Sequence, residues 1–172
     1  QDVLLDQMKV GKVHALDVAN QDEAIDIIYR YLLAVRNGAA RRNLRLLAMA
    51  IVGLTMRDRL FADEFSKYAI CLEALSRDEI LLIGTIHRHK RIAQKRQGNQ
   101  VGTRQYWPKI LEELKSKGFS SEEHIIAIGA SSLKSGLLYM PQDWDSTGTF
   151  TTSPIMDDIE NIIDFEESLR KE

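Results

Sequence analysis

A strongly basic stretch offers the most chemistry in this chain of 172 residues. Positions 88 to 109 hold seven lysines and arginines and no acidic residue. Basic side chains attract phosphate groups, and exposed aromatic rings stack on nucleic-acid bases. We therefore predict a binding segment over residues 86–107. Its candidate residues are Arg88, Lys90, Arg91, Lys95, Arg96, Arg104, Tyr106 and Trp107.

Three uses of this segment stay open. It could contact a protein partner or a second copy of the chain, track a nucleic-acid backbone, or be a solvated helix end with Trp107 packed on the helices. The C-terminal region, residues 141–172, carries nine acidic and two basic residues. Blocks of opposite charge attract each other, so pairing within the chain or between subunits is the simplest use of both.

A second basic cluster consists of Arg41, Arg42 and Arg45 at the start of a predicted helix. Cations at this end oppose the helix dipole unless an anion lies nearby. We expect a carboxylate from Asp22, Glu23 or the C-terminal helix to pair with the cluster. A bound anion is the alternative.

Metal binding and catalysis find little support in the sequence. His87 and His89 are two residues apart, which places them about 200° apart on a helix, so they cannot grip one ion together. Cys71 is the only cysteine, and its apolar neighbours predict a core position. Neither a nucleophile elbow nor a phosphate-binding loop occurs. We predict no metal, no cofactor and no catalytic residue, and an enzyme with a site hidden from the sequence stays an alternative.

The elements that must position these residues are mostly helices, because apolar residues recur at helical spacing. Asn20 with Glu23, Ser76 with Glu79 and Ser120 with Glu123 are the expected helix starts. Helices are predicted over residues 20–37, 39–56, 60–75, 76–92, 108–117, 120–135 and 153–169, and short strands over 137–140 and 149–152. In the first helix, we expect the buried stripe to be Ala24, Ile28, Tyr31, Leu32 and Val35. The fold class is therefore mainly α, a multi-helix bundle with one small β-hairpin near the C-terminus.

We divide the chain into an N-terminal arm (1–19), a three-helix unit (20–75) and a C-terminal unit (76–172) packed on it. Composition is that of an ordinary globular protein, with 44% hydrophobic and 28% charged residues. The net charge of −2 argues against a uniformly basic nucleic-acid coat. The longest apolar run, residues 44–56, is too short to span a bilayer, so we expect a soluble, cytoplasmic protein. The chain begins at Gln1, which leaves open a tag, signal or anchor upstream.

The order of elements after residue 76 resembles a winged helix-turn-helix domain. The strings "LKSGLLY" and "TGTFTTSP" are similar to the end of a recognition helix running into a wing. This resemblance implies DNA binding, with the third helix of the domain in the major groove. However, the first turn of that helix (120–124) carries two glutamates and no lysine or arginine, and the predicted wing carries Asp143 and Asp145. We therefore expect a binding protein that contacts a protein partner or its own copy, with a nucleic-acid-binding regulator as the alternative.

Overall fold

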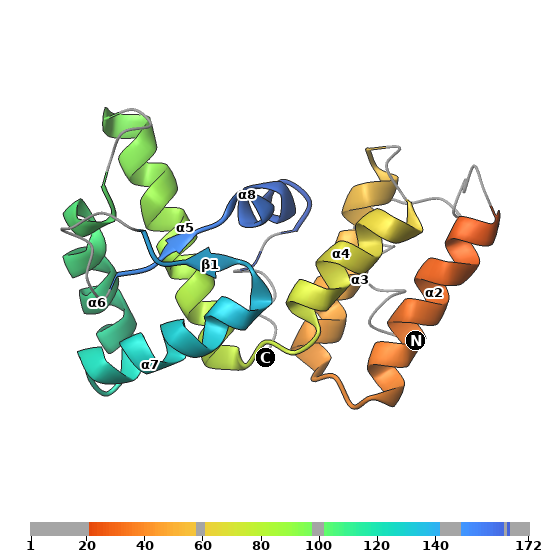
Figure 1. Ribbon diagram of the computed structural model, residues 1–172, viewed down its shortest axis with the longest axis horizontal. Coiled ribbons are helices and arrows are strands. Elements are labelled where there is room, and N and C mark those ends of the chain that lie inside the picture. The colour runs from red at the N-terminus through yellow and green to blue at the C-terminus, as the bar shows by residue number, and fades with distance from the viewer. Residues whose placement is uncertain (1–20, 58–60, 98–101, 142–148, 164, 166–172) are drawn as a thin grey trace. The chain divides into compact units, whose positions relative to one another are not determined.

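The structure is a computed structural model that describes residues 21–57, 61–97, 102–141, 149–163 and 165 (Figure 1). It confirms a mainly α fold with one small antiparallel sheet near the C-terminus. Contacts divide the chain into two compact units, of which the second runs from Ser76 to Asp157 and the first comprises the residues on either side. The predicted boundaries of arm, three-helix unit and C-terminal unit stay a prediction, because contacts alone do not test which parts fold independently.

Three helices build the first unit: α2 (Gln21–Arg36), α3 (Arg41–Thr55) and α4 (Ala62–Leu72) (Figure 1). Helix α3 is buried almost all round from Arg45 onwards, as its apolar sequence predicted. Helices α2 and α4 run in the same direction. Glu23 at the start of α2 accepts a hydrogen bond from the backbone N–H of Ala62, and Arg30 Nη2 lies 3.0 Å from Glu73 Oε1 at the other end of α4.

Two residues of α3, the polar Asn43 and the small Gly53, make close contacts with neighbouring segments. Asn43 is buried, and its Nδ2 donates to the carbonyl oxygens of Leu72 and Leu75, both at 2.8 Å. These hydrogen bonds satisfy carbonyl groups at and just beyond the C-terminal end of α4, which lack partners in the helix itself. At Gly53, a Cβ atom would lie 2.4 Å from the carbonyl oxygen of Ile162, so only glycine allows this close approach.

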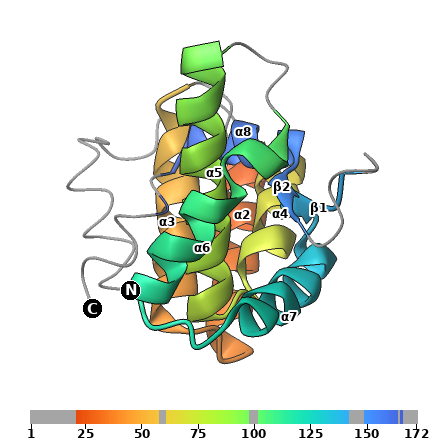
Figure 2. The ribbon, with the colours of Figure 1, turned by 90° about the vertical axis from the view of Figure 1, so that its left-hand side faces the viewer.

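The second unit follows the predicted order of helices and strands (Figure 2). Helix α5 packs against α6, α7 and β2, and the two strands pair antiparallel with Leu138 opposite Thr152 and Tyr139 opposite Thr151. The unit ends within α8. Its elements are α5 (Arg77–Gln97), η1 (Thr103–Gln105), α6 (Trp107–Ser116), α7 (Glu122–Ser132), η2 (Leu133–Ser135), β1 (Leu138–Tyr139), β2 (Thr151–Thr152) and α8 (Pro154–Glu160).

One of the predicted capping boxes is confirmed and one is wrong. Ser76 and Glu79 exchange hydrogen bonds, Ser76 N to Glu79 Oε2 at 2.7 Å and Glu79 N to Ser76 Oγ at 3.2 Å. At α7 the cap is Ser121 instead of Ser120, because Ser121 Oγ accepts from the backbone N–H of His124. The predicted partner of Glu23, Asn20, lies outside the described residues.

The C-terminal helix is shorter than the apolar spacing predicted. Ser153 precedes it as expected, but its hydroxyl donates to the carbonyl oxygen of Gly136 at 2.6 Å. Helix α8 ends at Glu160, and the described residues after it form turns in which Ile163 and Phe165 are buried. The predicted continuation to Leu169 lies outside the described residues.

Candidate protein-binding surface

Helix α2 packs into the first unit with a different face from the predicted one. Its buried apolar residues are Ile27, Tyr31 and Ala34. Of the predicted stripe, only Tyr31 is buried; Ala24 is half-buried, and the other three residues are exposed. The prediction was wrong because α2 carries apolar residues round most of its circumference, so periodicity alone could not select the packed side.

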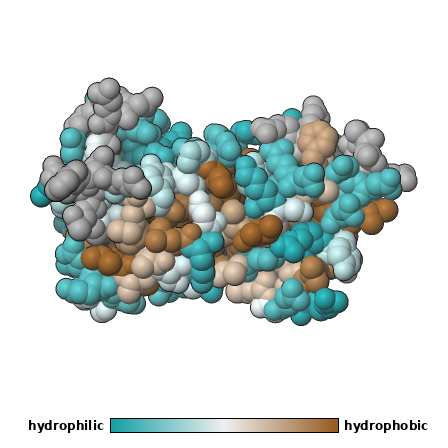
Figure 3. Space-filling view, in the orientation of Figure 1, coloured by the Kyte–Doolittle hydropathy of each residue, from teal (hydrophilic) through white to brown (hydrophobic). Residues whose placement is uncertain are grey.

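The consequence is a row of large apolar side chains on the outside of α2. We call it the α2 face: Ile25, Ile28, Tyr29, Leu32 and Val35, each between 40% and 64% exposed. In Figure 3, hydrophobic residues reach the surface at the edge of the molecule where Figure 1 shows α2. Single exposed apolar residues are ordinary, but a contiguous row on one helix face is a candidate interaction site.

The α2 face and the contacts with α4 lie on nearly opposite sides of the helix. Arg30 reaches Glu73 on α4. Leu32 follows two residues later and therefore points about 200° away round the helix. Arg36 is exposed at the C-terminal end of the face, whereas the exposed Asp26 precedes Ile28 by two residues and therefore points away from the face. The surface is therefore apolar along its length, with a cation at its C-terminal end.

The predicted basic segment is partly occupied by pairing inside the second unit. Glu113 on α6 accepts hydrogen bonds from Arg88 Nη2, from His89 Nε2 at 2.9 Å and from Lys117 Nζ at 2.7 Å. Burial by itself raises the pKa of Glu113. The hydrogen bonds from Lys117, His89 and Arg88 outweigh that effect and bring the pKa down to about 2.

Lys90 is held in a similar way on the other side of α5. Its Nζ lies 3.1 Å from both carboxylate oxygens of Asp157 and 3.1 Å from the carbonyl oxygen of Thr152. His87 is buried beside it, with Nδ1 3.1 Å from Thr152 Oγ1. Pairing between the basic block and the acidic C-terminal region is thus realised at Lys90 and Asp157.

The two aromatic residues of the predicted binding segment are buried, which argues against base stacking by either ring and agrees with the alternative in which Trp107 packs on the helices. Tyr106 lies with its hydroxyl 3.3 Å from Thr151 Oγ1. Trp107 packs against Phe150, with ring centroids 6.1 Å apart. Their large apolar area favours burial in the core of the second unit over exposure to solvent.

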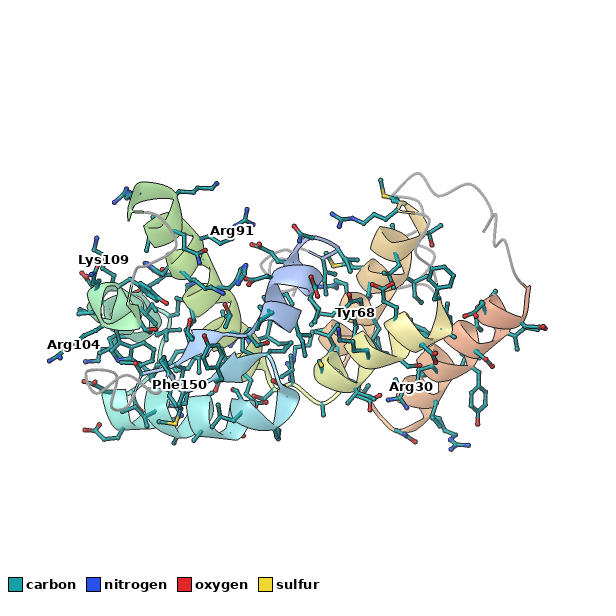
Figure 4. The ribbon with its side chains drawn as sticks, turned by 45° about the horizontal axis from the view of Figure 1, so that its top comes forward. Arg30, Tyr68, Arg91, Arg104, Lys109 and Phe150 are labelled. Carbon is teal, nitrogen blue, oxygen red and sulfur yellow. The ribbon has the colours of Figure 1, made fainter. Side chains whose placement is uncertain are left out.

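What stays exposed of the segment is a set of cations on α5 and η1. They are Arg91, Lys95 and Arg96 on α5 and Arg104 in η1, and Lys109 on α6 is exposed as well. Figure 4 shows Arg104 and Lys109 at the same end of this unit and Arg91 on α5. The first turn of α7, which the resemblance would place on DNA, exposes Glu122, Glu123 and His124. Two carboxylates there repel phosphate groups.

The second basic cluster does not form one surface. Arg45 is buried, Arg42 is half-buried and Arg41 is exposed. Of the predicted carboxylate partners, Glu23 is engaged at the start of α4 with Ala62. Pairing of this cluster with a carboxylate, and anion binding by it, stay predictions.

Groups that could support catalysis are tied into the structure. Ser131 Oγ donates to Glu79 Oε1 at 2.9 Å, at the helix start capped by Ser76. Cys71 is buried as predicted, and burial raises the pKa of its thiol. The described part of the chain contains no group of three or more histidine, cysteine or acidic side chains placed to hold a metal ion. Among the same residues, no helix is both long and apolar enough to cross a bilayer.

The exposure of the α2 face and the role of Glu113 were not predicted from the sequence. The surplus of apolar residues on α2 was a usable signal, since Ile25 and Tyr29 fit no single buried stripe. For Glu113 the sequence showed only Lys117 one turn away, because its other partners, Arg88 and His89, lie on a helix more than twenty residues earlier. No protein-family model, no curated protein and no solved structure matches this chain.

Proposed function

We propose that this protein acts by binding, through protein–protein contacts made by the α2 face. The observation that carries the proposal is the exposure of five large apolar side chains in a row on one helix. Exposed apolar rows of this kind lower the solubility of the protein on its own. Their burial against a partner favours association, because it removes apolar surface from water. The predicted basic segment is a weaker candidate, since Arg88 and Lys90 are already paired and both aromatic residues are buried.

Photocrosslinking in living cells tests the proposal. A photoreactive benzophenone amino acid is placed at Tyr29, in the middle of the α2 face, and at Lys67, an exposed residue of α4, as the matched control. We expect crosslinked species of higher mass from position 29 and none from position 67. A crosslink from position 29 only to the chain's own first twenty residues, or no crosslink at all, would overturn the proposal.

Nucleic-acid binding is the second candidate, supported by the exposed cations at the end of α5. Lys95 and Arg96 extend into solvent in the last turn of this helix. If they contact phosphates, the affinity for labelled oligonucleotides falls steeply with salt and falls further when both are changed to alanine. Binding that is absent even at low salt removes this candidate. We propose the cytoplasm as the compartment for either function, where a free thiol such as Cys71 stays reduced.

A further inference from the structure

The α2 face begins close to the residue at which the chain enters this helix. Helix α2 begins at Gln21, and Ile25, the first member of the face, follows four residues later. From Ile25 to Val35 the face is about 15 Å long, because a helix rises about 1.5 Å per residue. A segment that covers the face therefore has to extend only a short distance from the N-terminal end of α2.

Residues 1–20 supply a segment of suitable length and composition at this end of the helix. Ten of these twenty residues are hydrophobic, among them three leucines and a methionine. The length of the face corresponds to about ten residues of helix or about five of extended chain, so twenty residues allow a reversal of direction and full coverage in either conformation. Solvated linkers are low in hydrophobic residues, whereas a half-apolar composition favours burial of the side chains.

Covalent attachment favours this segment over a free partner. A ligand tethered by a short connection has an effective concentration on the order of millimolar. An intrachain contact with a dissociation constant below about a millimolar is therefore formed most of the time. A free partner, present at a much lower concentration, has to compete with it.

We propose that residues 1–20 cover the α2 face in the absence of a partner and are displaced when a partner binds. This inference rests on the proposed function and names the regulation of its site. The segment and the face are both rich in apolar side chains, so contact between them removes both from water. The apparent affinity of the partner is then lower than its affinity for the open face, because only the open fraction of the molecules can bind it.

Photocrosslinking of the purified full chain tests the cover. A benzophenone amino acid is placed at Ile28 on the face, and at Asp26 as the matched control, because Asp26 is exposed on the same helix but points about 200° away from Ile28. We expect a crosslink from position 28 to residues 3–16, identified by mass spectrometry after proteolysis, and none from position 26. Its yield should not change on dilution. The absence of this crosslink, or a yield that falls on dilution and so places the contact between two copies, would overturn the inference.

Substitutions within the segment test whether its apolar side chains make the contact. One variant loses three apolar side chains through Leu4→Ser, Leu5→Ser and Leu16→Ser. The matched variant keeps the net charge and the apolar content and carries Asp2→Ser, Gln7→Ser and Lys12→Ser. The first should lower the yield of the crosslink from position 28 at least severalfold, and the second should leave it unchanged. Equal yields in the two variants would refute an apolar cover, and circular dichroism verifies that both retain their helices.

The outcomes separate this inference from the proposed function. In living cells, loss of the three leucines should raise the yield of crosslinks from position 29 to other proteins at least severalfold, and an unchanged yield would overturn the regulation. Crosslinks to another protein in cells, without any crosslink to residues 3–16 in the purified chain, overturn the cover and leave the proposed function standing. Crosslinks that stay confined to the first twenty residues overturn the proposed function and leave the cover standing. No crosslink of either kind overturns both.

Discussion

Glu113 is the residue whose removal should reveal how the second unit is held together. It joins α6 to α5 by accepting hydrogen bonds from Arg88 and His89, and it also binds Lys117 one turn further along α6. At about 1.4 kcal/mol per pKa unit, a pKa lowered from 4.5 to about 2 corresponds to about 3 kcal/mol of stability at neutral pH. The side chain is 25% exposed, so we expect solvent screening to reduce this to about 2 kcal/mol.

The contribution of Glu113 depends on pH in a defined direction. Because the folded state lowers the pKa of this carboxyl group, its stabilising effect is complete above the ordinary value of 4.5. It decreases as the pH falls below that value and is lost near the folded pKa of about 2. The wild type should therefore lose stability in this acidic range, and Glu113→Gln should be less stable than the wild type at neutral pH but nearly equal to it at the lowest pH.

Urea unfolding followed by tryptophan fluorescence measures this difference. Trp107 is buried in the second unit, and a Trp144→Phe background leaves it as the only tryptophan. The control is Glu112→Gln, which changes an exposed neighbour on the same helix and should alter the free energy of unfolding by less than about 0.5 kcal/mol. If Glu113→Gln destabilised the protein equally at neutral and acidic pH, or not at all, the assignment of Glu113 as an ionised link between the helices would be refuted.

Three further substitutions test single contacts by thermal or urea unfolding. Asn43→Ala removes both hydrogen bonds to the end of α4 and should lower the free energy of unfolding by about 2 kcal/mol. Asn37→Ala, at an exposed position, should change it little, and equal effects of the two substitutions would contradict the capping role of Asn43. Gly129→Ala places a Cβ 2.4 Å from the Phe150 ring and should lower the free energy of unfolding by about 1–3 kcal/mol. Gly102→Ala is the control, because its Cβ meets nothing within 4 Å. A Gly129→Ala variant as stable as the wild type would show that the ring moves freely. Ser76→Ala removes one half of the capping box and should cost about 1 kcal/mol; no measurable loss would mean that Glu79 alone suffices.

Local sequence signals were sufficient for most of the helical elements. The capping box of Ser76 and Glu79 starts α5, and Pro108 lies in the first turn of α6. Gly38 and Gly118 follow helix ends with φ values of 78° and 99°, a region of backbone conformation that glycine enters at little cost. Signals of this kind act within a few residues of the chain, so they can be read without the tertiary structure.

The choice of packed face on α2 could not be made in this way. Ile27, Tyr31 and Ala34 compete with Ile28, Leu32 and Val35 for the interior, and both sets recur at helical spacing. The contacts of Glu23 with Ala62 and of Arg30 with Glu73 turn the first set towards the core of the unit. Since these partners lie about forty residues away in sequence, no local pattern contains them.

The basic segment shows the same division between sequence and tertiary structure. By itself, the sequence determined the mainly α fold, the hairpin, the core position of Cys71 and the uneven distribution of charge, because each depends on composition or on neighbouring residues. Only the tertiary structure decided which cations are paired, which aromatic residues are buried and which side of α2 faces solvent. These properties depend on contacts such as Lys90 with Asp157, between residues that are distant in the chain and adjacent only after folding.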